Sequence, residues 1–123
     1  MKFLIGLNGP AYASLRIVSG LLFLSHGVQK FFNFPAPFPM KLNPLLTSAG
    51  IIELVAGTLI MIGFATRPAA FIASGMAAVG YWLTHATKGI YPITNGGETI
   101  ALYCFVFLFI ATQGPGIWSV SKK

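Results

Sequence analysis

The stretch Leu21–Phe32, which reads LLFLSHGVQKFF, sets His26, Gln29 and Lys30 into a largely apolar run. Its leucines and phenylalanines are typical of a membrane helix, whereas His26, Gln29 and Lys30 can all donate hydrogen bonds. A second apolar run further along the chain contains one carboxylate, Glu53. Because ionisable groups are unfavourable in contact with lipid, we expect these side chains to face other helices rather than the bilayer.

The composition predicts a single integral membrane domain over residues 1–123. The chain is 55% hydrophobic and only 8% charged, with a mean hydropathy of +0.77. Soluble domains carry roughly 25% charged residues, and a chain of this length cannot bury so much apolar surface in its own core. We therefore expect lipid to face most of the surface.

Charge and cysteine content exclude two classes of function. The net charge of +6 comes from basic residues that are scattered along the chain, whereas a nucleic-acid surface needs a clustered basic patch. One cysteine, Cys104, allows neither an internal disulfide nor a CxxC redox pair. The N-terminal apolar segment 3–7 is too short for the core of a signal peptide, so we interpret it as a short interfacial lead-in.

The apolar runs predict an all-α bundle of four membrane-spanning helices over residues 13–32, 46–64, 68–87 and 97–113. Three prolines between residues 33 and 39 exclude a helix there. Pro68 suits the first turn of the third helix, and Gly114-Pro115-Gly116 ends the fourth. In the third helix, alanines at 69, 73 and 77 predict close helix packing.

The basic residues predict the orientation of these four helices. Arg16 lies in the first turn of the first helix, where we expect its side chain to extend toward the headgroups. Because cytoplasmic loops are enriched in lysine and arginine, the richer side is expected to be cytoplasmic, with both termini on it. The residues on that side are Lys2, Arg16, Arg67, Lys122 and Lys123, against Lys30, Lys41 and Lys88 on the other.

Each predicted helix brings one ionisable group to the outer third of the bilayer. These groups are His26, Glu53, His85 and Glu98, the only histidines and acidic residues of the chain. Helical spacing places Lys30 on the same face as His26. We therefore expect the groups to point into the bundle and to meet one another.

Several readings of this polar layer remain open. As a helix clamp, Glu53 would pair with Lys30 or His26, and Glu98 with His85. As a quinone site, His26, Lys30 or Gln29 would donate to a carbonyl oxygen and Glu53 would carry the proton. His26, Lys30 and Glu53 are then the candidate catalytic residues, and Gln29, His85 and Glu98 the candidate cofactor-binding residues. The spacing lacks HxxH or HExxH, so we predict no metal site, and four short helices leave little room for a solute channel.

Four motifs carry a family resemblance over about residues 15–120. They are Leu15-Arg16 with Gly20 and the run His26–Phe32, then Glu53–Gly57 continuing through Gly63–Ala70, Asn95–Glu98, and finally Gly114–Ser119. In this order they resemble the DoxX family of small bacterial membrane proteins. That family often has an aspartate after the tryptophan-serine step, whereas Ser121 and two lysines follow here.

The resemblance implies a multi-pass protein of the bacterial inner membrane. Some relatives are associated with oxidoreductase chemistry, including a subunit resembling thiosulfate:quinone oxidoreductase. We therefore expect a small membrane component of a redox system with a quinone-facing polar pocket. Without a flavin, haem or nucleotide motif, its electrons would come from a partner. The alternative is a non-enzymatic accessory subunit that docks to a larger membrane protein complex.

Overall fold

The computed structural model describes residues 1–121, and Lys122 and Lys123 lie outside the described residues. Within residues 1–121 the chain is helical and contains no strand, as the all-α prediction requires. The four long helices are α2 (Asn8–Phe32), α3 (Pro44–Ile62), α4 (Thr66–Gly80) and α6 (Glu98–Gln113). The short elements are α1 (Lys2–Ile5), the π-helical turn η1 (Tyr81–His85), the 3₁₀ turn η2 (Ala86–Lys88) and α5 (Pro92–Asn95).

Local capping accounts for where the first two long helices begin and end. Helix α2 starts at Asn8 instead of residue 13, because Pro10 falls in its first turn, where a missing N–H has no intrahelical partner to lose. The Asn43 side chain accepts a hydrogen bond of 2.8 Å from the Leu46 amide at the start of α3. Gly63, with φ of 76°, ends α3 two residues before the predicted boundary.

The third predicted helix is not one regular α-helix. Helix α4 ends at Gly80, and the chain continues through η1 and η2 as far as Lys88. The predicted bounds 68–87 therefore match the helical path but miss its change of geometry. Of the described helices, α2 and α3 are long and apolar enough to cross a membrane, and α6 is a shorter apolar helix.

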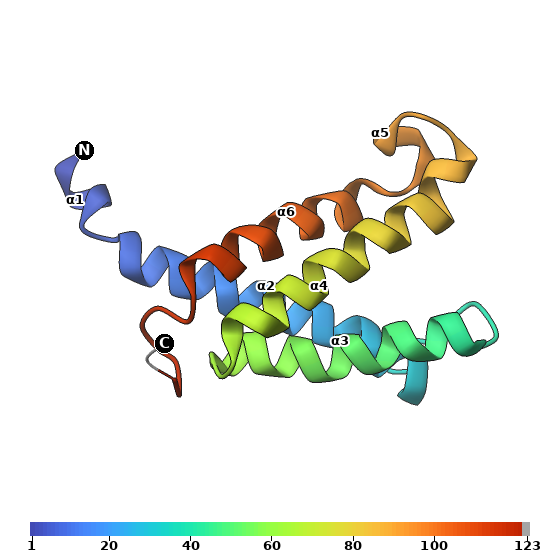
Figure 1. Cartoon of the computed structure of the whole chain (residues 1–123), viewed down its shortest axis with the longest axis horizontal. Helices are drawn as coiled ribbons and strands as arrows, with labels where there is room; N and C mark the ends of the chain where they lie inside the picture. The colour runs from blue at the N-terminus through green and yellow to red at the C-terminus, as the bar shows by residue number, and fades with distance from the viewer. Residues whose placement is uncertain (122–123) are drawn as a thin grey trace.

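The long helices form two pairs that diverge toward one end of the molecule (Figure 1). Helix α2 packs along α3 and α4 packs along α6, whereas the backbones of α2 and α6 come close at only a few positions and aromatic side chains, such as Phe23 and Phe107, connect these two helices. We call the end near residues 114–121 the convergent end, and the end with the loops 33–43 and 86–97 the divergent end. The core lies where the pairs converge and consists of Phe23, Ala56, Ile60, Ala69, Ala70, Ala73, Phe107 and Ile110.

Glycines hold α2 and α3 in close contact. A Cβ atom added to Gly20 would lie 2.6 Å from the Met61 amide nitrogen, and one on Gly57 would lie 2.7 Å from the Leu24 amide nitrogen. A Cβ on Gly27 would lie 2.9 Å from the Gly50 carbonyl oxygen. No real side chain fits at such distances, so glycine is what allows these backbones to approach.

The convergent end is fastened by arginine side chains. Arg16 is fully buried, and its guanidinium donates to the carbonyl oxygens of Ile60, Pro115, Ile117 and Trp118. The expectation that Arg16 extends toward the headgroups is therefore wrong, because the segment after α6 folds over it. Arg67 donates to the last carbonyl oxygens of α6, including that of Thr112 at 2.6 Å.

Candidate functional site

Lys30 and Glu53 form a buried ion pair between α2 and α3. Lys30 Nζ lies 2.6 Å from Glu53 Oε1, and the two side chains are only 9% and 6% exposed. Gly50 makes the contact possible, since a Cβ there would lie 3.3 Å from Lys30 Cδ and 2.7 Å from the Phe31 ring. Lys30 Nζ also lies 5.5 Å from the centre of the Phe38 ring, a cation–π distance.

His26 lies one helical turn before Lys30 and faces the other helix pair. Its side chain is exposed at the surface, and its ring meets the Tyr103 ring of α6 edge-on, with centroids 6.0 Å apart. Lys30 lies within electrostatic range of His26, and Glu53 within that of Tyr103. The structure thus groups an ion pair, an imidazole and a phenol where the two helix pairs face each other.

Gln29 lies outside this group. Its side-chain amide donates to the carbonyl oxygens of Ala36 and Pro37, both at 3.5 Å. These long hydrogen bonds connect the end of α2 to the proline-rich loop. The structure therefore records no contact between Gln29 and the Lys30–Glu53 pair.

The structure does not bring His85 and Glu98 to the pair. His85 Nδ1 lies 3.2 Å from the Asn95 carbonyl oxygen, and its ring stacks on Tyr81. Glu98 is exposed at the start of α6, and within residues 1–121 its carboxylate makes no ion pair. The prediction that four ionisable groups meet is therefore wrong for His85 and Glu98. Because the helix pairs diverge, these two residues stay with the loop of their own pair.

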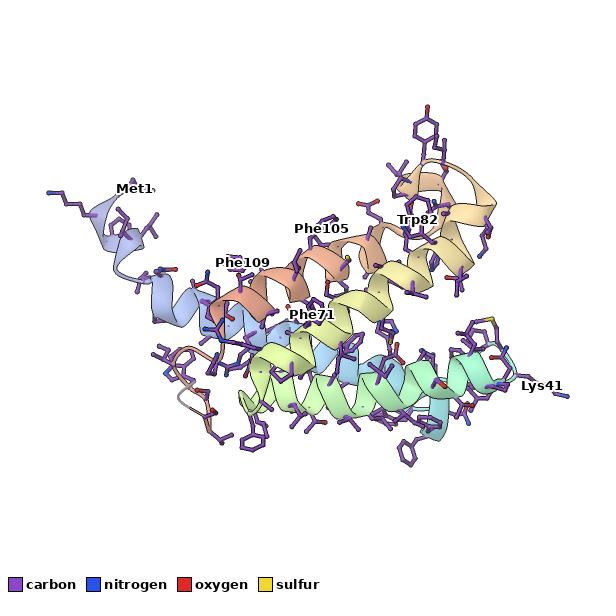
Figure 2. The ribbon with its side chains drawn as sticks, in the orientation of Figure 1. Met1, Lys41, Phe71, Trp82, Phe105 and Phe109 are labelled. Atoms are coloured by element: carbon purple, nitrogen blue, oxygen red, sulfur yellow. The ribbon has the colours of Figure 1, made fainter. Side chains whose placement is uncertain are left out.

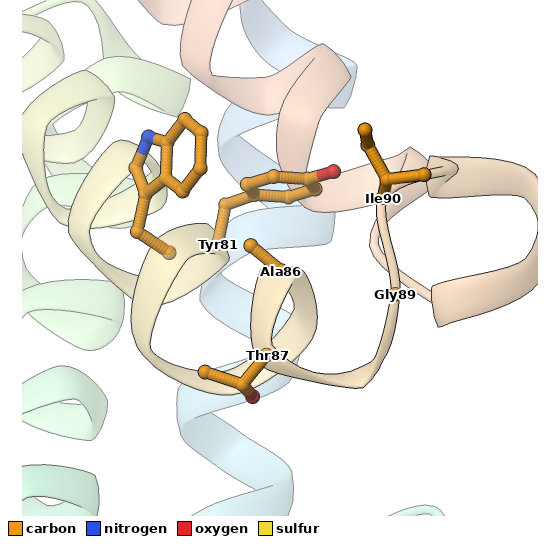
Figure 3. Close-up of a pocket in the computed structure, with 6 residues that line it drawn as sticks. Tyr81, Ala86, Thr87, Gly89 and Ile90 are labelled. Atoms are coloured by element: carbon orange, nitrogen blue, oxygen red, sulfur yellow. The ribbon is translucent and has the colours of Figure 1, made fainter.

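A buried asparagine organises that loop. Asn95 donates to the Tyr81 hydroxyl and the Gly89 carbonyl, each at 3.1 Å, and accepts from the Gly97 amide at 2.8 Å. Beside it lies a shallow hollow of about 330 Å³. Figure 3 shows this hollow between η1 and the following loop; its lining residues are Tyr81, Trp82, Ala86, Thr87, Gly89 and Ile90.

A second hollow of about 320 Å³ is an apolar groove between α3 and α4. Its lining residues are Ile51, Ile52, Val55, Ala56, Leu59, Ala65, Pro68, Ala69 and Ile72. Neither hollow is lined by His26, Lys30 or Glu53. Among residues 1–121, no three His, Cys, Asp or Glu side chains are grouped closely enough to hold a metal ion.

Tyr103 is the residue of this group that the sequence reading passed over. One signal was available: Tyr103 lies in the middle of an apolar run, whereas Tyr12 and Tyr91 lie near predicted helix ends. Tyrosine at a helix end is typical of an interfacial belt. A phenol at mid-helix depth instead needs a local hydrogen-bond partner.

Comparison with known proteins agrees with the motifs. The DoxX family model matches residues 11–86. The chain is 40% identical over 118 residues to an uncharacterized protein of Haemophilus influenzae, covering 90% of this chain and 88% of that protein. It is 25% identical to an uncharacterized membrane protein of Mycobacterium tuberculosis, covering 93% and 81%. No solved structure matches. The chain therefore belongs to the DoxX family and is a membrane protein.

Proposed function

We propose that this DoxX protein is a small component of a redox system in the bacterial cytoplasmic membrane, with a quinone-facing site in the outer part of its bundle. The observation that carries the proposal is the Lys30–Glu53 ion pair, 2.6 Å long and nearly fully buried, one turn from the exposed imidazole of His26. Intramembrane ionisable groups commonly mark ligand sites and proton pathways.

The proposed membrane topology has four spans: α2, α3, the helical path 66–88 and α6. Large apolar side chains on the outside of α4, η1 and α6 support contact with lipid (Figure 2): Phe71, Trp82 and Phe105 are 67%, 69% and 68% exposed. Helix α6, with 16 residues, covers about 24 Å of the roughly 30 Å hydrocarbon core. A local thinning of the bilayer accommodates that difference.

The side chains fit the chemistry of a quinone ring. Its carbonyl oxygens accept hydrogen bonds, and both His26 and the ammonium group of Lys30 are donors. Reduction of a quinone takes up protons, and in this proposal the Glu53 carboxylate carries one of them. The electrons come from a partner protein in this proposal. With both termini in the cytoplasm, the divergent end and this site lie toward the outer side.

The alternative function is that of a non-enzymatic accessory subunit. The observation in its favour is that Lys30 and Glu53 satisfy each other, so the pair by itself can pin α2 to α3. In this reading the exposed apolar surface docks to a larger membrane protein complex. The two functions predict different consequences when the pair is removed.

The first test measures quinone that remains with the protein after purification in mild detergent. We expect Glu53→Gln and His26→Ala to lose most of it, whereas Lys41→Gln, an exposed loop change, keeps the wild-type amount. Unchanged quinone content in both site variants would refute the proposal.

A paired substitution separates the ligand site from the helix clamp. Removing one partner of a buried ion pair costs about 3–5 kcal/mol, whereas removing both charges is often close to neutral. Lys30→Met/Glu53→Gln should therefore recover much of the thermal stability that either single change loses. A quinone site predicts that this stable double variant still lacks quinone. An accessory subunit predicts that the double variant retains the same amount of quinone as wild type, even where that amount is zero. It also predicts that only the single variants assemble poorly into the complex.

A further inference from the structure

Tyr103 occupies a fixed position in the middle of α6. Its ring stacks on Phe107, with centroids 5.5 Å apart and an interplanar angle of 20°. The edge contact with Phe23 has a centroid distance of 6.0 Å. Both phenylalanines belong to the core. The direction of the Tyr103 hydroxyl is therefore set by core packing.

The hydroxyl of Tyr103 has no hydrogen-bond partner among residues 1–121, although the residue is half-buried. Two other tyrosine hydroxyls are satisfied: that of Tyr12 donates to the Gly114 carbonyl at 2.6 Å, and that of Tyr81 accepts from Asn95. A phenol in apolar surroundings usually has a partner, because an unmade hydrogen bond is costly there.

The nearest polar ring to Tyr103 that the structure records comes from the other helix pair. His26 of α2 meets it edge-on at 6.0 Å, and within residues 1–121 the imidazole nitrogens of His26 also make no hydrogen bond. Elsewhere the backbones of α2 and α6 come close at only a few positions. Two hydrogen-bonding groups without partners thus face each other from opposite helix pairs, within electrostatic range of Lys30 and Glu53 respectively.

From this juxtaposition we propose that Tyr103 determines the specificity of the quinone site by donating a hydrogen bond from its hydroxyl to a ring carbonyl oxygen. His26 serves the same ring from α2, so the ligand joins the two helix pairs. A planar ring with oxygen acceptors fits this setting, which offers aromatic surfaces and two groups able to donate. The inference rests on the proposed function and adds a residue from α6 to it.

The test compares Tyr103→Phe with wild type in lipid nanodiscs, using a short-tailed benzoquinone as the probe. The substitution keeps the ring contacts with Phe23 and Phe107, so we expect an unchanged melting temperature. Loss of one neutral hydrogen bond should raise the Kd about three- to tenfold. Tyr91→Phe is the matched control, because that side chain is 66% exposed in the loop, and its Kd should equal that of wild type.

A second probe distinguishes the hydrogen bond from a change in packing. It carries the same tail on a ring without oxygen atoms, and Tyr103→Phe should leave its affinity unchanged. Equal weakening of both probes would overturn the inference, as would equal quinone affinity in wild type and Tyr103→Phe. If wild type binds quinone and Glu53→Gln does not, an unaffected Tyr103→Phe overturns this inference alone. If wild type binds no quinone, the proposed function fails with it.

Discussion

Arg16 carries a buried charge that is stabilised by hydrogen bonds to main-chain carbonyl groups of the convergent end. Its Nε lies 3.0 Å from the Ile60 oxygen, and its terminal nitrogens lie 2.9 Å and 2.7 Å from the Ile117 and Trp118 oxygens. A buried charge normally requires a paired carboxylate. Here a curved backbone supplies the acceptors: Gly114, Gly116 and Trp118 all have positive φ, which turns the segment around the guanidinium.

Replacing Arg16 by lysine should destabilise the protein even though the charge is kept. An ammonium group cannot reproduce the planar fork of donors that reaches several carbonyl groups, and hydrogen bonds to charged groups contribute about 1.5–3 kcal/mol each. We expect a clear drop in melting temperature and faster proteolysis within residues 114–121. Arg67→Lys, at an exposed site, should have a smaller effect; equal effects of the two substitutions would contradict this account.

The sequence predicts which side chains are functional candidates, but it does not predict main-chain partners. The pairing of Glu53 with Lys30 or His26 is predictable, because opposite charges in apolar helices have few other partners. The acceptors of Arg16 and His85 are carbonyl groups, which every residue carries, so no residue pattern reveals them. The role of Tyr103 is not predictable from the sequence, because it depends on a neighbour in a distant helix, His26.

The α2–α3 pair depends on glycine at its contact face. Gly20→Ala or Gly57→Ala would place a Cβ within 2.6–2.8 Å of backbone atoms of the facing helix, so the helices must separate. We expect each change to lower stability by about 1–3 kcal/mol, the usual range for overpacking, as measured by thermal unfolding in detergent.

Gly75→Ala is the control for this experiment. Gly75 lies on the exposed side of α4, and a Cβ there meets no heavy atom within 4 Å. The melting temperature should not fall, because alanine has the higher helix propensity. A loss of stability equal to that of Gly57→Ala would contradict the account that close contact between α2 and α3 makes glycine necessary.

At the scale of elements, apolar runs located all four long helices but not their exact ends. Helix α2 starts at Asn8 and not at the predicted residue 13, because a proline that breaks helix interiors is tolerated in a first turn. The turns η1 and η2 were not foreseen, since a single π-helical turn has no sequence period. What maintains this path is the Asn95 side chain, which binds Tyr81 and Gly89.

The whole molecule has chemically different ends. Arginines bind carbonyl groups at the convergent end, whereas the ion pair, both histidines and the longer loops lie toward the divergent end. Small core residues, Ala56, Ala69 and Ala73 among them, let the helix pairs approach where they converge. Composition predicted a membrane protein, but it could not predict this divergence, which results from packing between helices that are distant in sequence.

The proposed topology is tested with single cysteines introduced after Cys104 is replaced by serine. Lys41→Cys, at the tip of a divergent-end loop (Figure 2), should react with a membrane-impermeant maleimide in intact spheroplasts. Lys2→Cys, in the exposed helix α1, should react only after permeabilisation. The opposite pattern of labelling would indicate the inverted orientation, and labelling of both in intact spheroplasts would contradict the proposal that α2 crosses the bilayer.

Arg16 is synthesised well before the segment that encloses it. Its acceptors at Pro115, Ile117 and Trp118 follow it by 99 to 102 residues, so the ribosome makes them long after α2 has left the exit tunnel. When α2 first enters the membrane, its guanidinium has none of these acceptors and stays in water or among lipid phosphates. In that interval Arg16 can help to orient the nascent chain as a positively charged flank does. The same residue then becomes the anchor of the segment that encloses it.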